Sequence, residues 1–195
     1  MALAMIYFCL DCEASGQLAP LYNLLSIGVV VVRPEGDHHV LGESFYVELQ
    51  PIFPGFDPAA LAVCGLDPAR LAREGVEPKQ AMVRLSEWVR RQNRPATDRP
   101  VFVGHNAVFD WAYIQYYYAH FQLDNPFGYK GIDSKSVAMG RLGLTWNETS
   151  KEKLAERLNL PQQDPAQAHR ADYDAWYQAL IFKALLDYRG VPRSA

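Results

Sequence analysis

The first half of the chain alternates between short apolar runs and polar turns, a pattern typical of β-strands. Residues 4–10 form an apolar, bulky run, and residues 23–33 form a second run of the same kind. The segment PEGDHH is typical of a turn, and residues 40–49 then alternate like a third strand. Because short turns join the three runs, they predict an antiparallel meander.

From residue 57 onward the apolar positions take the spacing of helices. The segment DPAALAVCGLDPARL predicts two short helices, each entered through Asp-Pro with the proline in the first turn. A turn at ATDRP and short strands at 101–103 and 129–132 are expected between longer helices. These helices are predicted over residues 78–91, 110–121, 134–142, 151–158 and 169–188. A meander followed by alternating strands and helices predicts an α/β fold with a mixed five-stranded sheet flanked by helices.

Length and composition predict one globular domain over residues 1–195, with 49% hydrophobic and 21% charged residues. No apolar run approaches the ~20 residues of a membrane span, and no secretory leader is evident, so we expect no membrane association. Three cysteines without disulfide spacing indicate reduced thiols and a cytoplasmic location. Cys9 and Cys12 are at an odd offset within a strand, which points them to opposite faces and disfavours a zinc or redox pair.

Two acidic residues, Asp11 and Glu13, follow the first apolar run and are one residue apart. Side chains alternate in a strand, so the even-numbered apolar residues from 6 to 12 share one face and the two acids share the other. One interpretation is a solvated strand end that starts a turn at Ser15 and Gly16. The other is a platform for a divalent metal ion, because hard cations bind carboxylate oxygens. This pair alone does not decide between them.

Two more acids begin the apolar stripes of predicted helices, Asp110 in residues 110–121 and Asp174 in the last helix. The helix dipole favours an acid in a first turn but does not explain why both acids point inward. Buried acids need partners, and no lysine or arginine is evident among these four. Their convergence therefore predicts metal ions. Two ions about 4 Å apart activate a water and stabilise a leaving oxygen in phosphodiester hydrolysis.

Three motifs resemble those of the DEDD exonucleases. DCEASG contains the DxE of the first motif, and GHNAVFD at 104–110 resembles the HNxxFD of the second. HRADYD at 169–174 resembles the HxAxxD that defines the histidine-containing DEDDh branch. The connecting segment VCGLDPARL is also similar, so the resemblance extends over residues 5–188. The chain thus resembles the DnaQ-like group of ribonuclease T, oligoribonuclease and the proofreading subunit of bacterial DNA polymerase III.

The resemblance implies a ribonuclease H-like fold and 3′→5′ exonuclease chemistry on the 3′ end of single-stranded nucleic acid, with nucleoside 5′-monophosphates as products. It implies Asp11, Glu13, Asp110 and Asp174 as ligands of two divalent cations, Mg²⁺ or Mn²⁺, and His169 as the general base. We expect His169 on the loop before the last helix, because five residues of helical rotation would place it away from the face of Asp174.

Candidates for substrate binding follow the first two motifs: Ala14, Ser15, His105 and Asn106. Many members of the family carry threonine where this chain has Ala14, which bears on nucleotide preference. For His105, a hydrogen bond to nearby backbone is the favoured alternative.

Other polar and aromatic residues have two open interpretations each. Five basic residues are either phosphate contacts or solvated surface: Lys130, Lys135, Arg141, Lys151 and Lys153. Three rings off the stripe of helix 110–121 either stack bases or, as we favour, pack against the helix at 78–91 or a second subunit: Trp111, Tyr116 and Tyr118. His38 and His39 are expected to be solvated in a hairpin turn, and Asp172 to cap the last helix without a catalytic role.

The net charge of −3 becomes +1 with two divalent cations bound, which permits a short single-stranded ligand and disfavours a long duplex. We therefore predict a metal-dependent 3′→5′ exonuclease, with RNA and DNA not distinguished. The alternatives are a catalytically silent nucleic-acid-binding or scaffold protein of the same fold, and a polymerase-associated proofreading subunit. Only RGVPRSA follows the last predicted helix, which disfavours the proofreading subunit. A homodimer is left open.

Overall fold

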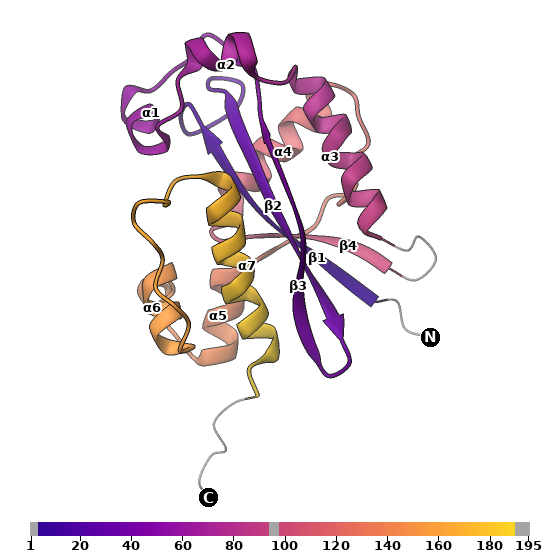
Figure 1. Cartoon of the computed structure of the whole chain (residues 1–195), viewed down its shortest axis with the longest axis vertical. Coiled ribbons are helices and arrows are strands. Elements are labelled where there is room, and N and C mark those ends of the chain that lie inside the picture. Colours follow the sequence, from indigo (N-terminus) through magenta and orange to yellow (C-terminus); the bar gives the residue numbers. More distant parts are fainter. Residues whose placement is uncertain (1–3, 94–97, 190–195) are drawn as a thin grey trace, which may run out of the picture.

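A twisted five-stranded sheet carries helices on both faces in the computed structural model, which describes residues 4–93 and 98–189 (Figure 1). The strands are β1 (Ala4–Ala14), β2 (Leu24–Glu35), β3 (His38–Glu48), β4 (Asp98–Gly104) and β5 (Gly131–Asp133). Their order is β3-β2-β1-β4-β5. The first three strands pair antiparallel, and β4 pairs parallel with both β1 and β5. The expected meander and the mixed sheet are both confirmed.

The helices lie close to their predicted positions. They are α1 (Pro58–Cys64), α2 (Pro68–Glu74), α3 (Pro78–Gln92), α4 (Val108–His120), α5 (Ser134–Leu142), α6 (Lys151–Arg157) and α7 (Ala171–Asp187). The side chains of Asp57 and Asp67 cap α1 and α2, each of which begins with proline, as the sequence predicts. Within the described ranges, none of these helices has the length and apolar character that crossing a membrane requires.

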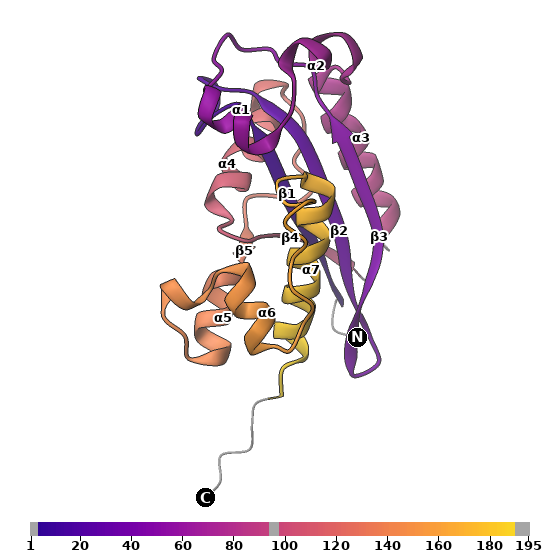
Figure 2. The same cartoon turned by 60° about the vertical axis from the view of Figure 1, so that its left-hand side comes forward.

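Both faces of β1 are covered, which makes it the centre of the core. Its even-numbered side chains, including Phe8 and Cys12, pack with α3 and α4 on one face. Its odd-numbered side chain Cys9 packs on the other face with Phe182 of α7 (Figures 1 and 2). Cys9 and Cys12 are therefore free, buried thiols on opposite faces, as their odd spacing predicts.

Two strands extend beyond their predicted ends. β1 continues to Ala14, so Asp11 and Glu13 lie inside a paired strand, opposite Gly28 and Ser26 of β2. Pairing with β2 therefore continues past the apolar run of residues 4–10, and the two acids share one face of the strand, as the alternation predicts. β4 begins at Asp98, so the second half of the predicted ATDRP turn is strand, while residues 94–97 lie outside the described part.

A short 3₁₀ helix at Trp146–Glu148 was not predicted; it is held by a capping box between Thr145 and Glu148. Of the three off-stripe rings of α4, Tyr118 packs against α3, as favoured, whereas Trp111 packs against β4 and Tyr116 against Phe53. Trp111 packs edge-on against Phe102 with ring centroids 4.9 Å apart, and the buried Tyr118 hydroxyl lies 2.9 Å from Ser86 Oγ on α3.

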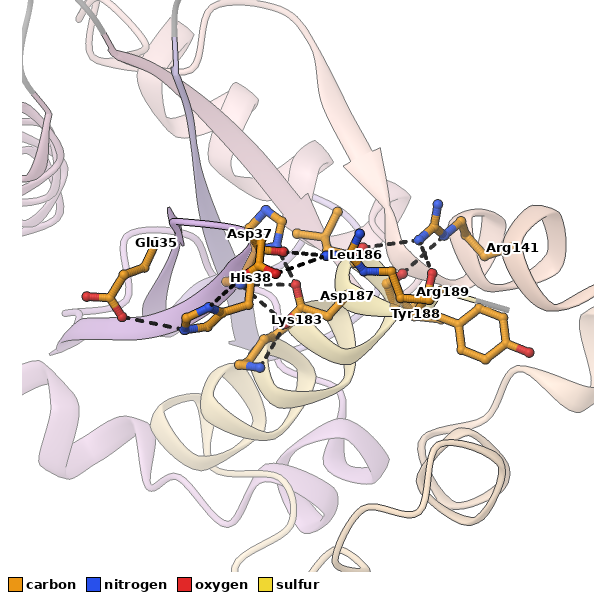
Figure 3. A network of polar contacts seen from close by, with 11 residues as sticks. Glu35, Asp37, His38, Arg141, Lys183, Leu186, Asp187, Tyr188 and Arg189 are labelled. Carbon is orange, nitrogen blue, oxygen red and sulfur yellow. Dashed lines mark hydrogen bonds and ion pairs between the residues drawn. The ribbon is translucent and has the colours of Figure 1, made fainter. Parts of the chain in front are cut away.

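The end of α7 is tied to the β2–β3 hairpin by a polar network (Figure 3). The Asp187 carboxylate accepts hydrogen bonds from the His39 backbone N–H at 3.0 Å and from Lys183 Nζ at 2.9 Å, and it lies 2.7 Å from His39 Nδ1. Burial raises the pKa of Asp187, but these hydrogen bonds outweigh it and hold the pKa at about 2. The prediction of a solvated His39 was wrong, because α7 returns to cover the hairpin.

The beginning of α7 touches the sheet at Gly28 of β2. A Cβ atom at this position would overlap the backbone of Ala171 and Asp172, so glycine is what permits the close approach. Because Gly28 is the register partner of Asp11, the approach brings the first turn of α7 directly over the first acid of β1.

We therefore expect Gly28→Ala to lower the free energy of unfolding by about 1–3 kcal/mol, because the added methyl group forces α7 away from the sheet. Urea denaturation followed by circular dichroism measures this. Gly140→Ala on exposed α5 is the matched control, because a Cβ there meets no other atom. It should raise stability by up to about 1 kcal/mol through helix propensity. Equal effects of the two substitutions would contradict the close approach.

Candidate active site

Three elements bring the four predicted acids to one cavity of about 480 Å³. Asp11 and Glu13 come from β1, Asp110 from the first turn of α4, and Asp174 from the first turn of α7. Asp110 and Asp174 are each only 5% exposed, so both point inward as the apolar stripes predict. His169 also lines this cavity.

The backbone of β1 fixes Asp110. Its Oδ1 accepts a hydrogen bond from the Cys12 N–H at 2.8 Å, in the strand residue between Asp11 and Glu13. The start of α4 is thereby tied to the two acids of β1, and one carboxylate oxygen of Asp110 is held in a defined direction.

The loop before α7 closes around Asp174. Oδ2 of Asp174 accepts from the His169 backbone N–H at 2.7 Å, and Oδ1 accepts from Gln163 Nε2 at 2.7 Å. His169 precedes the helix, as expected, and its side chain is exposed. Its φ of 63° is uncommon for a residue other than glycine, and such strained conformations are concentrated at functional sites.

The ammonium group of Lys151, the first residue of α6, lies among the acids. It forms a very short ion pair with Asp174 Oδ1 and lies 3.8 Å from Asp11 Oδ1. The expectation that no basic residue stands among the four acids was therefore wrong. Lys151 and Gln163 come from a helix start and a loop, where no apolar periodicity indicates the direction of a side chain.

Three of the four acids are held where ionisation is unfavourable: Asp11, Glu13 and Asp110. Burial raises the pKa of Asp11 to about 7, opposed by Lys151 and reinforced by repulsion from Asp174. Burial, with repulsion from Asp11 and Asp174, raises the pKa of Glu13 to about 8. Burial and Asp11 also raise the pKa of Asp110 well above its ordinary value. Such a site gains strongly from bound cations.

Two of the four substrate-binding candidates line the cavity. Nδ1 of His105 lies 2.8 Å from Ser134 Oγ on α5, so its hydrogen bond reaches across the sequence rather than to nearby backbone. Burial, helped by the positive charges of Lys151 and Lys135, lowers the pKa of His105 to about 4 and keeps it neutral. Asn106 is exposed at φ 70°, and its N–H donates to Asp133 Oδ1 at 2.9 Å.

The other two substrate-binding candidates, Ala14 and Ser15, are buried and lie outside the residues that line the cavity. Ser15 Oγ donates to the Gly55 carbonyl at 2.8 Å and accepts from the Asn23 N–H at 2.8 Å. The hydroxyl of Ser15 therefore holds the loop after β3 against the end of β1.

Of the basic residues considered as phosphate contacts, some line the cavity and others make contacts elsewhere. Lys135 lines the cavity with Lys151, and its Nζ lies 3.9 Å from the ring centroid of Trp146. Arg141 donates to backbone carbonyls at the end of α7 (Figure 3), and Lys153 Nζ donates to the Asn147 carbonyl at 2.8 Å. Lys130 Nζ lies 5.2 Å from the ring centroid of Tyr129.

Asp172 does not cap α7 as expected. Its Oδ1 accepts from the N–H of Tyr173, the next residue, and its Oδ2 lies 2.9 Å from Arg170 Nη2. It points away from the four acids and outside the residues that line the cavity.

The donor set fits hard divalent cations, because the carboxylates offer only oxygen ligands at a desolvated site. Carboxylate oxygens of Glu13 and Asp174 and a ring nitrogen of His169 lie within 4.8 Å of one another, so an ion held by the two carboxylates would lie beside the His169 ring. Fold and site together define a metal-dependent hydrolase with converging carboxylates on a mixed α/β sheet.

Comparison with known proteins identifies the family. The family model for exonucleases of the RNase T type matches residues 8–182. The 3′-5′ DNA exonuclease Cap18 of Escherichia coli is 34% identical over 180 residues, covering 92% of this chain and 91% of that protein. Ribonuclease T of Cronobacter sakazakii is 29% identical over 178 residues, with coverages of 89% and 78%.

Solved structures agree in fold. The nuclease domain of 3′hExo, a DEDDh family member bound to rAMP, superposes with a TM-score of 0.76 at 12% identity and covers 95% of this chain and 92% of that one. The Escherichia coli exonuclease I complex with single-stranded DNA gives a TM-score of 0.69 at 16% identity, covering 95% and 40%. The chain belongs to the DEDDh, DnaQ-like exonuclease family and has its ribonuclease H-like fold. It is a metal-dependent 3′→5′ exonuclease.

The raised pKa values of Asp11 and Glu13 predict that the metal-free protein loses stability as pH rises. An acid with a raised folded-state pKa binds more protons folded than unfolded, so its contribution is complete below about pH 4 and is lost through pH 7 to 8. We expect a loss on the order of a few kcal/mol. Thermal melts in chelator between pH 5 and 8 measure it, and Mg²⁺ or Mn²⁺ should restore stability.

Glu13→Gln should flatten this pH dependence, because the variant lacks one of the three acids whose pKa is raised. Glu156→Gln on the exposed side of α6 is the matched control and should leave the profile unchanged. A metal-free melting temperature that is constant from pH 5 to 8 would contradict the desolvated cluster.

Proposed function

We propose that the chain removes nucleoside 5′-monophosphates one at a time from the 3′ end of single-stranded nucleic acid. In this proposal Asp11, Glu13, Asp110 and Asp174 hold two divalent ions, Mg²⁺ or Mn²⁺, and His169 is the general base. One observation carries it: β1, α4 and α7 bring four carboxylates into one cavity beside an exposed histidine.

The bound ions would supply an activated water and charge stabilisation on the departing 3′ oxygen. The chain supplies orientation and proton transfer. The hydrogen bonds to Asp110 from Cys12 and to Asp174 from His169 and Gln163 fix the carboxylates before substrate arrives. The His169 ring is exposed beside them, where it can accept the proton of the attacking water.

A single strand is the substrate that suits this surface. The protein has a net charge of −3, which disfavours binding to a long duplex, because many phosphate contacts require many basic side chains. The exonuclease I neighbour is described in complex with single-stranded DNA, which supports the same choice. The relatives divide between a DNA exonuclease and ribonucleases, so matched DNA and RNA strands are both to be assayed.

We further propose that residues 1–195 act as one exonuclease domain in the cytoplasm. The family match over residues 8–182 supports one domain, and three free, buried cysteines support a reducing compartment.

We also propose a homodimer through β3, which forms one edge of the sheet and offers its backbone groups for pairing. Light scattering after size-exclusion chromatography tests it, and a monomer at micromolar concentration would contradict it.

A free 3′ hydroxyl end should be required, because the terminal nucleotide must enter the cavity lined by the four carboxylates, where a 3′ phosphate would add bulk and further negative charge. A 5′-labelled strand with a 3′ phosphate should be digested much more slowly than its 3′-hydroxyl counterpart, and the products should be 5′-monophosphates. A gel ladder with Mn²⁺ and with chelator measures this on matched DNA and RNA. Digestion of a closed circular single strand at the linear rate would show that the activity is not exonucleolytic.

His169→Ala should lower kcat by about 10²–10⁴-fold, the usual contribution of a positioned base. The Mn²⁺ affinity should remain, since His169 is proposed as a base and not a ligand. His38→Ala in the exposed hairpin is the control. A loss of Mn²⁺ affinity as large as that of Asp174→Ala would make His169 a ligand.

A further inference from the structure

Lys151 is the basic side chain in most direct contact with the acids, and the family motifs assign it no role. It is the first residue of α6, and both Lys151 and the N-cap residue Ser150 line the cavity. Its side chain is 16% exposed, and its ammonium pairs with Asp174 and lies 3.8 Å from Asp11. It therefore faces carboxylates from both β1 and α7.

An ammonium and a divalent ion cannot share these oxygens without strong repulsion. Asp174 Oδ1 accepts from Lys151 and from Gln163, so the oxygen is already engaged in the metal-free protein. An ion that binds this oxygen must compete with the ammonium. Lys151 thus neutralises part of the buried negative charge while the ions are absent.

When ions displace the Lys151 ammonium from the carboxylates, it can move to another position within the same cavity. Lysine carries its charge on a flexible four-carbon stem, and the same cavity is also lined by His105, Asn106 and Phe109. Four carboxylates balance two divalent ions, which leaves the charge of Lys151 to match the single negative charge of a phosphodiester. An oxygen of the phosphate at the 3′ end is the partner that this charge balance selects.

We propose that Lys151 exchanges partners during the reaction cycle: it holds Asp11 and Asp174 in the metal-free protein and contacts the scissile phosphate once the ions are bound. Lys151 is thus a substrate-contacting residue that also lowers metal affinity. This inference rests on the proposed function, because it assigns the same cavity to metal and to the 3′ end.

Two measurements on Lys151→Met test the exchange. Calorimetric titration with Mn²⁺ alone should show tighter binding by about tenfold or more, because the competing charge is gone. The KM for a labelled single strand at saturating Mn²⁺ should rise by about 10- to 100-fold, because the phosphate loses a charged partner. Lys151→Arg, which keeps the charge, should retain part of the substrate affinity. Lys151→Gln replaces the Met variant if the latter does not fold.

Lys153→Met is the matched control, two residues along α6 with its ammonium on the Asn147 carbonyl outside the cavity. It should change neither quantity. If Lys151→Met leaves Mn²⁺ affinity unchanged or weaker, or leaves KM unchanged, the exchange is wrong. A parent enzyme that binds Mn²⁺ but does not shorten strands would instead overturn the proposed function, and the Mn²⁺ titration would still decide whether the ammonium competes.

Discussion

The desolvation of carboxylates on the central strand is the constraint on which this structure depends. β1 is buried on both faces, yet it carries Asp11 and Glu13 inside its paired length. Burial raises the pKa of both groups, so the folded chain holds carboxylates where ionisation is unfavourable, in the wall of the cavity at the end of its central strand. A protein keeps such charge only where something compensates it, and two divalent ions are the compensation that oxygen donors select.

The rest of the fold serves to complete the set of ligands around β1. Gly28 lets the backbone of Ala171 approach the strand beside Asp11, and the Cys12 N–H fixes Asp110 at the start of α4. The far end of α7 is held by the network around Asp187 (Figure 3). α7 is thus anchored at both ends, so the orientation of Asp174 follows from contacts that lie at opposite ends of one helix.

Periodicity was enough to predict the sheet, the helices and the inward direction of Asp110 and Asp174, because apolar stripes report which face of an element is buried. It placed His169 on the loop, since its rotation from Asp174 excludes a shared helical face. It did not place Lys151 or Gln163, because a residue at a helix start or in a loop takes its direction from tertiary contacts. Nor did it indicate that Ser15 is buried, since one partner of its hydroxyl, the Gly55 carbonyl, comes from a loop 40 residues away.

The same reasoning explains why a lysine belongs in an acidic site. Without a counter-charge, the metal-free chain would bury four acids whose mutual repulsion opposes folding. Lys151 supplies one positive charge from α6, which leaves the site folded but still short of positive charge. A site that folds without metal and whose negative charge is only partly neutralised binds cations strongly. Because the ammonium is tethered, it stays in the cavity when ions replace it, where its charge favours an anionic phosphodiester. The feature that stabilises the metal-free site is therefore also one that can help to hold the substrate.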